Sequence, residues 1–116
     1  MAGIAFYNLV WEELEASPSG LRGSCKAALR RLAEAQPGAP TGLRLEKLQS
    51  AITELKVSWN RQEFRLLFFR EQSVVYVVNF FQKKTRKCPP SEIARAVGRM
   101  TEIQVDQAKV LTRSLH

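Results

Sequence analysis

Positively charged side chains are the strongest candidates for chemistry in this 116-residue sequence. Residues 54–87 hold eight of them against three glutamates, so this segment carries a net charge of +5 out of the total of +7. The most informative are Lys56, Arg65 and the run Lys-Lys-Thr-Arg-Lys at residues 83–87. Lysine and arginine bind phosphate, and the planar guanidinium group can do so through two hydrogen bonds. The segment predicts a polyanion-binding surface, with a solvated basic surface as the alternative.

Each candidate also has a purely structural interpretation. Arg65 stands in an otherwise apolar stretch, so it is either a paired arginine of a sheet or a phosphate-binding fork. Lys56 alternates with apolar neighbours and projects from the opposite strand face. Residues 83–87 are either a solvated loop or a phosphate-binding one. Most aromatic residues of the segment are expected in the core, and Tyr76 is the best candidate to stack on a base, which is worth ~1–3 kcal/mol.

Other chemistries find little support in the sequence. The only histidine is His116, so a histidine-dependent triad or a zinc site is not expected. Two cysteines, Cys25 and Cys88, are too few for a disulfide framework, and Cys25 falls on an apolar helical stripe as a core residue would. A carboxylate pair such as Glu54 with Glu63 is conceivable, but in a basic segment we expect these groups to form salt bridges. No metal or other cofactor is predicted.

Length and composition predict a single domain over residues 1–116. The hydrophobic content of 45% fits a globular protein. No run approaches the ~20 apolar residues of a membrane-spanning helix. The first residues carry three glutamates and no positive leader, so we expect no secretory signal. These features predict a soluble cytoplasmic protein without a membrane partner.

Two helices are expected near the start of the chain. Asn8 can cap a helix over residues 8–16, and Ser-Pro-Ser-Gly at residues 17–20 ends it. Apolar residues at helical spacing predict a second helix over about residues 21–35. A short breaker between two helices indicates an αα-hairpin. Residues 4–7 precede the hairpin as a short edge strand or an extended lead-in.

From residue 51 the hydrophobic period changes to two, which predicts strands. Strands are expected over residues 51–59, 63–71 and 74–82, joined by short turns that make neighbours antiparallel. The middle strand is apolar on both faces, so we place it centrally in the sheet. Residues 43–48 are either another short strand or irregular.

A third helix should follow the basic run. Pro90 stands at its first turn with Glu92 close behind, and apolar residues recur at helical spacing to Ile103. Residues after 106 continue this helix or fray. The predicted fold class is α+β, with an N-terminal αα-hairpin, an antiparallel sheet of about three to four strands, a C-terminal helix, and the helices on one sheet face.

The order of these motifs resembles the phage-derived Gp49-like/HigB family of the RelE/ParE toxin superfamily. The resemblance covers about residues 20–105. The shared motifs are Ile-Thr-Glu-Leu-Lys at residues 52–56, Glu-Phe-Arg-Leu-Leu-Phe-Phe at 63–69, the apolar strand at 74–81, Lys-Lys-Thr at 83–85, Pro89, Glu-Ile at 92–93, Ala96 and Arg99. Members of the family typically end the apolar strand in His-Gly-Phe and follow it with a Lys-Lys-Thr loop.

The resemblance implies the toxin of a type II toxin–antitoxin system with a RelE/ParE-like fold. Such toxins are generally metal-independent endoribonucleases (mRNA interferases) that arrest growth, and they often act on the ribosome. The implied partners are mRNA, the ribosome and a cognate antitoxin, commonly a helix-turn-helix DNA-binding protein. The resemblance implies Lys56, Arg65, Lys83 and Lys84 as catalytic residues and Lys87 as an RNA-binding residue. Arg61 and Arg86, from their charge, and Tyr76, from its polar aromatic ring, are further RNA-binding candidates.

The chain departs from the family pattern where catalysis would need a proton carrier. Residues 79–81 read Asn-Phe-Phe in place of His-Gly-Phe, Lys56 stands where arginine is usual, and Ile52 or Thr53 stands where an aromatic residue is frequent. In the mechanism we infer, the RNA 2′-hydroxyl attacks its own 3′-phosphate. A lysine whose pKa is lowered by neighbouring cations would act as base, and Arg65 would stabilise the phosphorane charge.

Two other functions remain open from the sequence. A non-catalytic module of the same fold, which binds nucleic acid or a partner, is favoured by the missing histidine. A ParE-like inhibitor of DNA gyrase is a third possibility, and the Lys-Lys-Thr loop argues against it.

Overall fold

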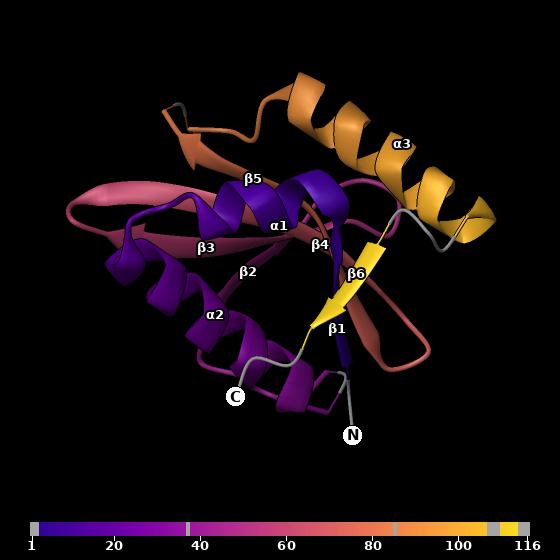
Figure 1. Cartoon of the computed structure of the whole chain (residues 1–116), viewed down its shortest axis with the longest axis horizontal. Helices are drawn as coiled ribbons and strands as arrows, with labels where there is room; N and C mark the ends of the chain where they lie inside the picture. Colours follow the sequence, from indigo (N-terminus) through magenta and orange to yellow (C-terminus); the bar gives the residue numbers. More distant parts are fainter. Residues whose placement is uncertain (1–2, 37, 85, 107–109, 114–116) are drawn as a thin grey trace.

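The computed structural model describes residues 3–36, 38–84, 86–106 and 110–113. A six-stranded mixed sheet forms its centre, in the order β2-β3-β4-β5-β1-β6 (Figure 1). Three helices pack against it. The predicted α+β class is therefore confirmed, whereas the predicted three to four strands were too few.

Three consecutive strands form the middle of the sheet, as the alternating pattern predicted. They are β3 (Thr53–Trp59), β4 (Gln62–Glu71) and β5 (Val74–Lys83), paired antiparallel. Each connection has two residues with positive φ, at 52° and 63° for Asn60 and Arg61 and at 51° and 68° for Gln72 and Ser73. This is the backbone of the tight hairpin turns that match the twist of a sheet.

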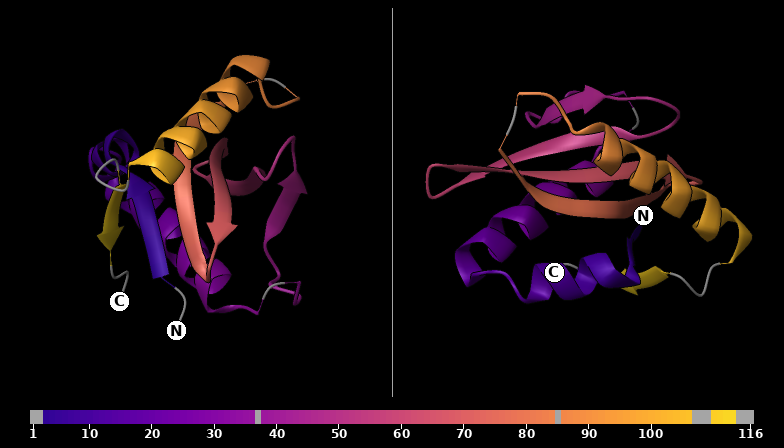
Figure 2. Two further views of the ribbon diagram at one scale, coloured as in Figure 1. Left: turned by 90° about the vertical axis from the view of Figure 1, so that its right-hand side faces the viewer. Right: turned by 90° about the horizontal axis from the view of Figure 1, so that it is seen from above.

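Two of the outer strands come from segments for which the sequence left a strand open. The third lies after residue 106, where the prediction of a continued helix or a frayed end was wrong. β2 (Arg44–Lys47) pairs antiparallel with β3 at one edge. β1 (Gly3–Tyr7) runs parallel to β5, and β6 (Val110–Arg113) covers the other side of β1. The first segment is thus an internal strand and not an edge strand, because the chain returns after residue 106 to pair with it. Figure 2 shows β2 and β6 at opposite edges of the sheet.

The helices cover both faces of the sheet, which corrects the prediction of helices on one face. α1 (Asn8–Glu15) and α2 (Ser19–Glu34) pack on one face, while α3 (Pro90–Val105) packs on the other. The physical reason is β4, whose middle six residues are all buried and need cover on both sides. Asn8 is the first residue of α1 and not its cap; Tyr7 holds the N-cap position without a side-chain hydrogen bond.

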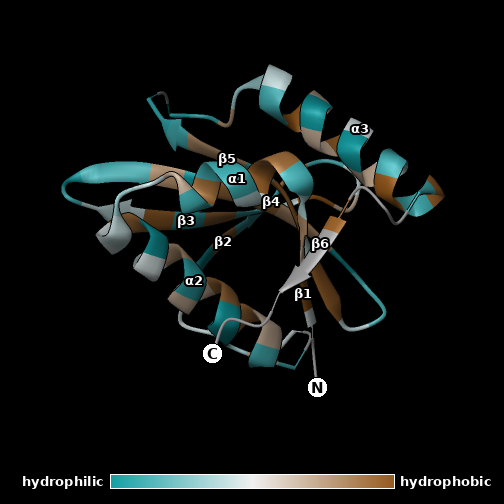
Figure 3. Cartoon of the chain, viewed as in Figure 1, coloured by the Kyte–Doolittle hydropathy of each residue, from teal (hydrophilic) through white to brown (hydrophobic). Residues whose placement is uncertain are grey.

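Two hydrophobic clusters result, one on each face. The larger joins α1 and α2 to β1, β3, β4 and β5 through residues such as Phe6, Leu29 and Leu66, and includes Cys25 as predicted. The smaller joins α3 to the sheet through Leu67, Phe69, Val78, Ala96 and Ile103. Figure 3 shows hydrophobic colours in the middle of the strands and hydrophilic ones at the β3–β4 turn and the end of β5. None of the helices in the described ranges has the length and apolar character to cross a membrane.

The first turn of α2 packs directly on Trp59, which gives a test of this packing. A Cβ at Gly20 would lie 2.5 Å from the indole Nε1, whereas a Cβ at Gly23 of the same helix meets nothing within 4 Å. We expect Gly20→Ala to destabilise the protein by about 1–3 kcal/mol, because the rigid indole must move. The control Gly23→Ala should stabilise it by roughly 0.5–1 kcal/mol through helix propensity. Urea unfolding measures both; equal effects would contradict this contact.

Candidate functional site

The strand register brings the predicted cations together on the face that α3 partly covers. Lys56 of β3 lies opposite Arg65 of β4, and Arg65 lies opposite Phe81 of β5. In the next row Glu63 lies opposite Lys83. Alternation along each strand places these side chains on the side away from α1 and α2. We call the part of the sheet that carries Lys56, Arg65 and Lys83 the cationic face.

Carboxylates interleave with the cations on this face. Glu46 of β2 accepts a hydrogen bond from Lys56 Nζ at 2.9 Å. Arg65 lies 3.5 Å from Glu54 through Nε and 3.4 Å from Glu63 through Nη1. Glu63 also meets Arg44 at 3.2 Å and accepts a short hydrogen bond from the Ser58 hydroxyl. The expectation that Glu54 and Glu63 form salt bridges is confirmed, and the face is an ionic network and not a uniform basic patch.

Arg65 and Glu54 form the buried floor of the network. Arg65 is 4% exposed and Glu54 is 1% exposed. Arg65 Nη1 also donates to the carbonyl oxygen of Phe64 at 3.1 Å. Neither Arg65 Nε nor Glu54 Oε2 has a hydrogen-bond partner within the described part of the chain, so the pair is close but imperfectly bonded. Removing one partner of such a buried pair costs about 3–5 kcal/mol because the other charge is left alone.

The outer carboxylates are ionised at neutral pH. The hydrogen bond from Lys56 holds the pKa of Glu46 below its ordinary value. The hydrogen bond from Ser58, with those from Arg44 and Arg65, does the same for the pKa of Glu63. Both groups therefore carry negative charge beside the predicted phosphate ligands. They are also the nearest carboxylates that could accept a proton from a bound substrate.

The other predicted cations lie beyond the end of the network. Lys83 ends β5 and is partly exposed, and Lys84, Arg86 and Lys87 follow as exposed residues. Lys83 and Lys84 form no ion pair with any residue that the structure describes. Thr85 of the Lys-Lys-Thr motif and His116 lie outside the described residues. Arg61 is exposed at the tip of the β3–β4 turn.

Tyr76 lies away from these cations. It stacks on Phe69 beneath α3, with ring centroids 4.8 Å apart and an angle of 10° between the planes. Lys83 lies seven positions further along β5, a distance of roughly 20 Å at strand rise. Phe81 is the partly exposed aromatic residue that neighbours Arg65. The sequence reasoning missed Phe81 because only the strand register identifies which aromatic side chain lies beside the cations.

Asn79 connects the cationic face to the start of α3. It is 1% exposed, and its Nδ2 donates to the backbone oxygen of Glu92 at 3.0 Å and to Glu92 Oε1 at 2.8 Å. Its Oδ1 is buried without a described partner. These bonds fix the first turn of α3 relative to β5. They therefore hold in place the two elements that residues 84–89 connect. Asn79 stands where the resembled family has histidine, and the sequence alone did not identify this role.

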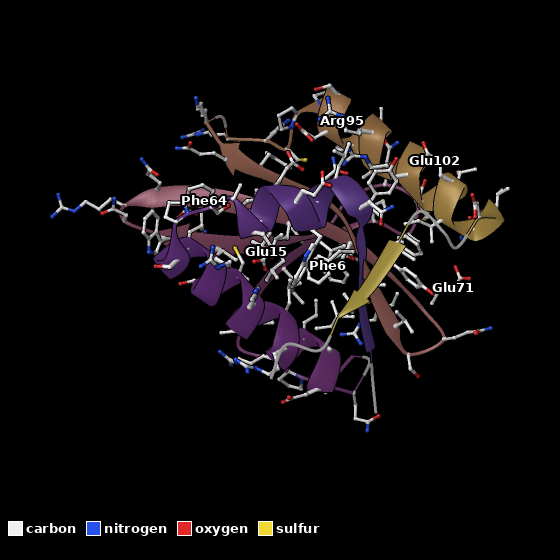
Figure 4. The ribbon with its side chains drawn as sticks, viewed as in Figure 1. Phe6, Glu15, Phe64, Glu71, Arg95 and Glu102 are labelled. Atoms are coloured by element: carbon white, nitrogen blue, oxygen red, sulfur yellow. The ribbon has the colours of Figure 1, made fainter. Side chains whose placement is uncertain are left out.

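Side chains on the two faces of the sheet belong to different sets of contacts. Phe6 and Phe64 belong to the hydrophobic cluster under α1 and α2, whereas Arg95 and Glu102 project from α3 (Figure 4). Glu102 accepts a hydrogen bond from the Tyr7 hydroxyl at 2.8 Å, and Arg99 lies 4.5 Å over the Tyr7 ring. Arg99, a residue of the family motif, also donates to the Val78 carbonyl at 2.7 Å. Its contacts attach α3 to β1 and β5.

The described side chains form neither a metal-binding cluster nor a reactive thiol. No group of three or more histidine, cysteine, aspartate or glutamate residues in the described ranges could hold a metal ion. Burial, with the nearby Glu54 charge, raises the pKa of Cys88 to about 11, and burial raises that of Cys25 to about 12. Both side chains are therefore protonated thiols at neutral pH.

Thiol alkylation tests this assignment. At about pH 8 a thiol of pKa about 11 is ionised in roughly one molecule in a thousand. We expect iodoacetamide to modify Cys88 and Cys25 slowly in the folded protein and rapidly in guanidinium chloride, as followed by mass spectrometry. Modification of Cys88 in the folded protein at the rate of a free thiol would contradict its burial beside Glu54.

Comparison with known proteins agrees with the resemblance read from the motifs. No curated protein matches the chain. The sequence model of the family described as "Phage derived protein Gp49-like (DUF891)" matches residues 12–101. The match extends from α1 through nearly all of α3 and includes every residue of the cationic face from Glu46 to Lys83. The chain therefore belongs to the phage-derived Gp49-like protein family.

Proposed function

We propose that this protein is the toxin of a toxin–antitoxin pair and that it cleaves mRNA on the cationic face. Family membership is compatible with a toxin. The observation that carries the proposal is the convergence of Lys56, Arg65 and Lys83 from three adjacent strands onto one sheet face. Three cations at neighbouring positions suit the closely spaced phosphates of a nucleic acid.

Each part of the face has a role in the proposal. Lys83 and Lys84, which have no described ion pair, contact the RNA phosphates directly. Lys56, which is held by its ion pair with Glu46, adds a positive charge beside the RNA. Arg65 places positive charge at the floor beneath the scissile phosphate. Phe81 offers a partly exposed ring on which a base can stack. Arg61, Arg86 and Lys87 extend RNA contacts beyond the face.

The proposed reaction uses the substrate's own nucleophile. The RNA 2′-hydroxyl attacks the adjacent phosphorus, its proton passes to Lys83 or Lys84 in the neutral amine form, and the P–O5′ bond breaks to leave a 2′,3′-cyclic phosphate. The departing 5′-oxygen takes up a proton from solvent water, and the lysine returns its proton to solvent. Lys83 and Lys84 are the proposed bases because the described residues give them no carboxylate partner that would hold them in the charged form. Arg65 stabilises the negative charge that develops on the phosphorane.

The ionic network favours one alternative, a non-catalytic binding module. Glu46, Glu54 and Glu63 neutralise Lys56, Arg65 and Arg44, and the described face holds no histidine. Such a face can bind RNA or a partner through Lys83 and Lys84 without cleaving. Activity measurements on variants distinguish the two functions.

The partners proposed with this function are mRNA, the ribosome and an antitoxin. The ribosome would hold the mRNA on the cationic face, so that fewer contacts from the protein itself are needed to position the RNA. The antitoxin would be a helix-turn-helix DNA-binding protein encoded beside the toxin.

Charge-removal variants test the site. We expect Lys83→Ala/Lys84→Ala to reduce mRNA cleavage on induced expression about 100-fold or more, because a base and phosphate contacts are lost. Arg65→Lys, which keeps a charge beside Glu54, should reduce cleavage about 10-fold or more while the protein stays folded. The matched control is Lys47→Ala on β2, whose side chain lies on the opposite sheet face. Full growth arrest and cleavage by the Lys83/Lys84 variant would overturn the site.

The pH dependence of cleavage distinguishes the two kinds of proton acceptor. Glu46 and Glu63 have pKa values below the ordinary glutamate value, so a carboxylate base would be fully ionised and give a flat rate from about pH 6 to pH 9. A lysine base is protonated over most of this range, so the rate should rise with pH. Single-turnover cleavage of an RNA oligonucleotide measures the profile. We expect the rising form, and a flat profile would transfer the role to a carboxylate.

A packing variant tests the position of the basic residues after β5. We expect Asn79→Leu to reduce cleavage about 10-fold, because it removes both bonds to Glu92 and frees the start of α3. Asn79→His, which keeps a donor at the position, should retain more activity than Asn79→Leu. Circular dichroism confirms that both variants fold. Equal activity of Asn79→Leu and the unchanged protein would contradict the positioning role.

A further inference from the structure

A pocket of about 420 Å³ opens on the sheet face opposite the cationic face, next to edge strand β2. This volume lies in the range of ordinary ligand pockets. Its apolar lining includes Leu32 from α2, Leu45 from β2 and Phe68 from β4. The polypeptide between α2 and β2 closes one side through Gly38, Ala39 and Thr41. The pocket is thus independent of the residues proposed for RNA cleavage.

The charge of this pocket is entirely positive. Lys47 and Arg70 are its charged lining residues, and no aspartate or glutamate of the described chain lines it. One Arg70 nitrogen donates to the Leu32 carbonyl at 2.8 Å. Neither cation forms an ion pair within the described residues, in contrast to Lys56 and Arg65. A half-buried guanidinium beside an apolar surface and without a carboxylate favours an anionic group of a ligand.

The strand beside the pocket has an unpaired outer edge. β2 pairs only with β3 in the described sheet, and all four of its residues are exposed (Figure 2). Leu45 is 40% exposed and is one of three exposed large hydrophobic residues among those that the structure describes. Register places Leu45 and Lys47 on the pocket side and Arg44 and Glu46 on the cationic face. Alternate residues of a strand added at this edge would therefore face the pocket.

We propose that β2 and this pocket together dock an acidic, extended segment of a partner protein. The segment pairs its backbone with the outer edge of β2, as in recognition by strand addition. One apolar side chain fills the space between Leu45 and Phe68, and a carboxylate two residues away binds Lys47 and Arg70. The net charge of +7 attracts an acidic partner over distance.

Two features separate this edge from an ordinary protected one. Short, charged edge strands commonly prevent association, and β2 is short with three charged residues. A strand that serves only to prevent association does not require an apolar pocket beside it, and it does not require that unpaired cations line such a pocket. β2 has both features. Because the pocket and the cationic face lie on opposite sides of the sheet, a partner docked here leaves the RNA site open.

A designed peptide tests the proposal without RNA. The probe is an acetylated, fluorescein-labelled peptide of threonines alternating with leucine and glutamate, Thr-Leu-Thr-Glu-Thr-Leu-Thr-Glu-Thr, and the matched probe has lysine for glutamate. Fluorescence polarisation should show saturable binding of the acidic peptide. Lys47→Glu should weaken this binding roughly tenfold and strengthen binding of the lysine peptide. Arg61→Glu, the same charge change at the distant β3–β4 turn, should alter either affinity less than about twofold.

Two further measurements fix the location. Leu45→Ser, which changes no charge, should also weaken binding of the acidic peptide several-fold. Amide chemical shifts should move at residues 44–47, 51 and 68 on peptide addition. The proposal is overturned if the acidic peptide fails to bind, if Lys47→Glu and Arg61→Glu act equally, or if the shifts cluster at residues 83–87. The last result would identify the peptide as a polyanion on the cationic face.

Discussion

The structure depends on a strand that is buried on both faces and still contains a charge. All six residues from Phe64 to Phe69 are buried, so β4 requires apolar cover on each side. α1 and α2 supply one cover and α3 the other. Arg65 is the exception within this strand, and its guanidinium needs carboxylates because an isolated buried charge is too costly. Glu54 on the adjacent strand β3 and Glu63, two positions earlier on β4 itself, provide them.

This constraint explains why structure and candidate site share one region. The salt bridge between Arg65 and Glu54 joins β4 to β3. The register of these two strands aligns Lys56 with Arg65, and the register of β4 with β5 aligns Glu63 with Lys83. Bound RNA phosphates would have to compete with Glu46 and Glu63 for the cations. Such competition makes RNA affinity strongly dependent on salt, and it favours a substrate that another body, such as the ribosome, already holds.

Local patterns predicted the elements whose partners are close in sequence. Alternation and short turns identified β3, β4 and β5, and Pro90 marked the start of α3. The parallel pairing of Gly3–Tyr7 with β5 was not predictable, because it joins segments about 70 residues apart without a local signal. The sequence showed that β4 is apolar on both faces. A strand of this kind needs cover on each side, and this need explains why α3 packs on the second face.

The cations of the candidate site were named from the sequence, whereas the positions of Glu46, Phe81 and Asn79 relative to them were not. Lys56 and Arg65 follow from strand alternation, but Glu46 depends on the pairing of β2, which the sequence left open. The orientations of the Phe81 and Asn79 side chains depend on an irregularity in the pairing of β5 with β4. This irregularity shifts the register opposite Leu67 and Phe68. A regular strand would place Tyr76 and Phe81 on opposite faces, whereas here both face the α3 side.

The most direct measurement of the central claim is a map of transcript 5′ ends after induced expression of the unchanged protein. RNA cleavage on the cationic face predicts new 5′ ends within messages, absent when Lys83→Ala/Lys84→Ala is induced at the same level. Growth arrest without new 5′ ends would contradict cleavage and point to another target, such as DNA gyrase. Neither arrest nor new ends would contradict the toxin function and leave a binding module.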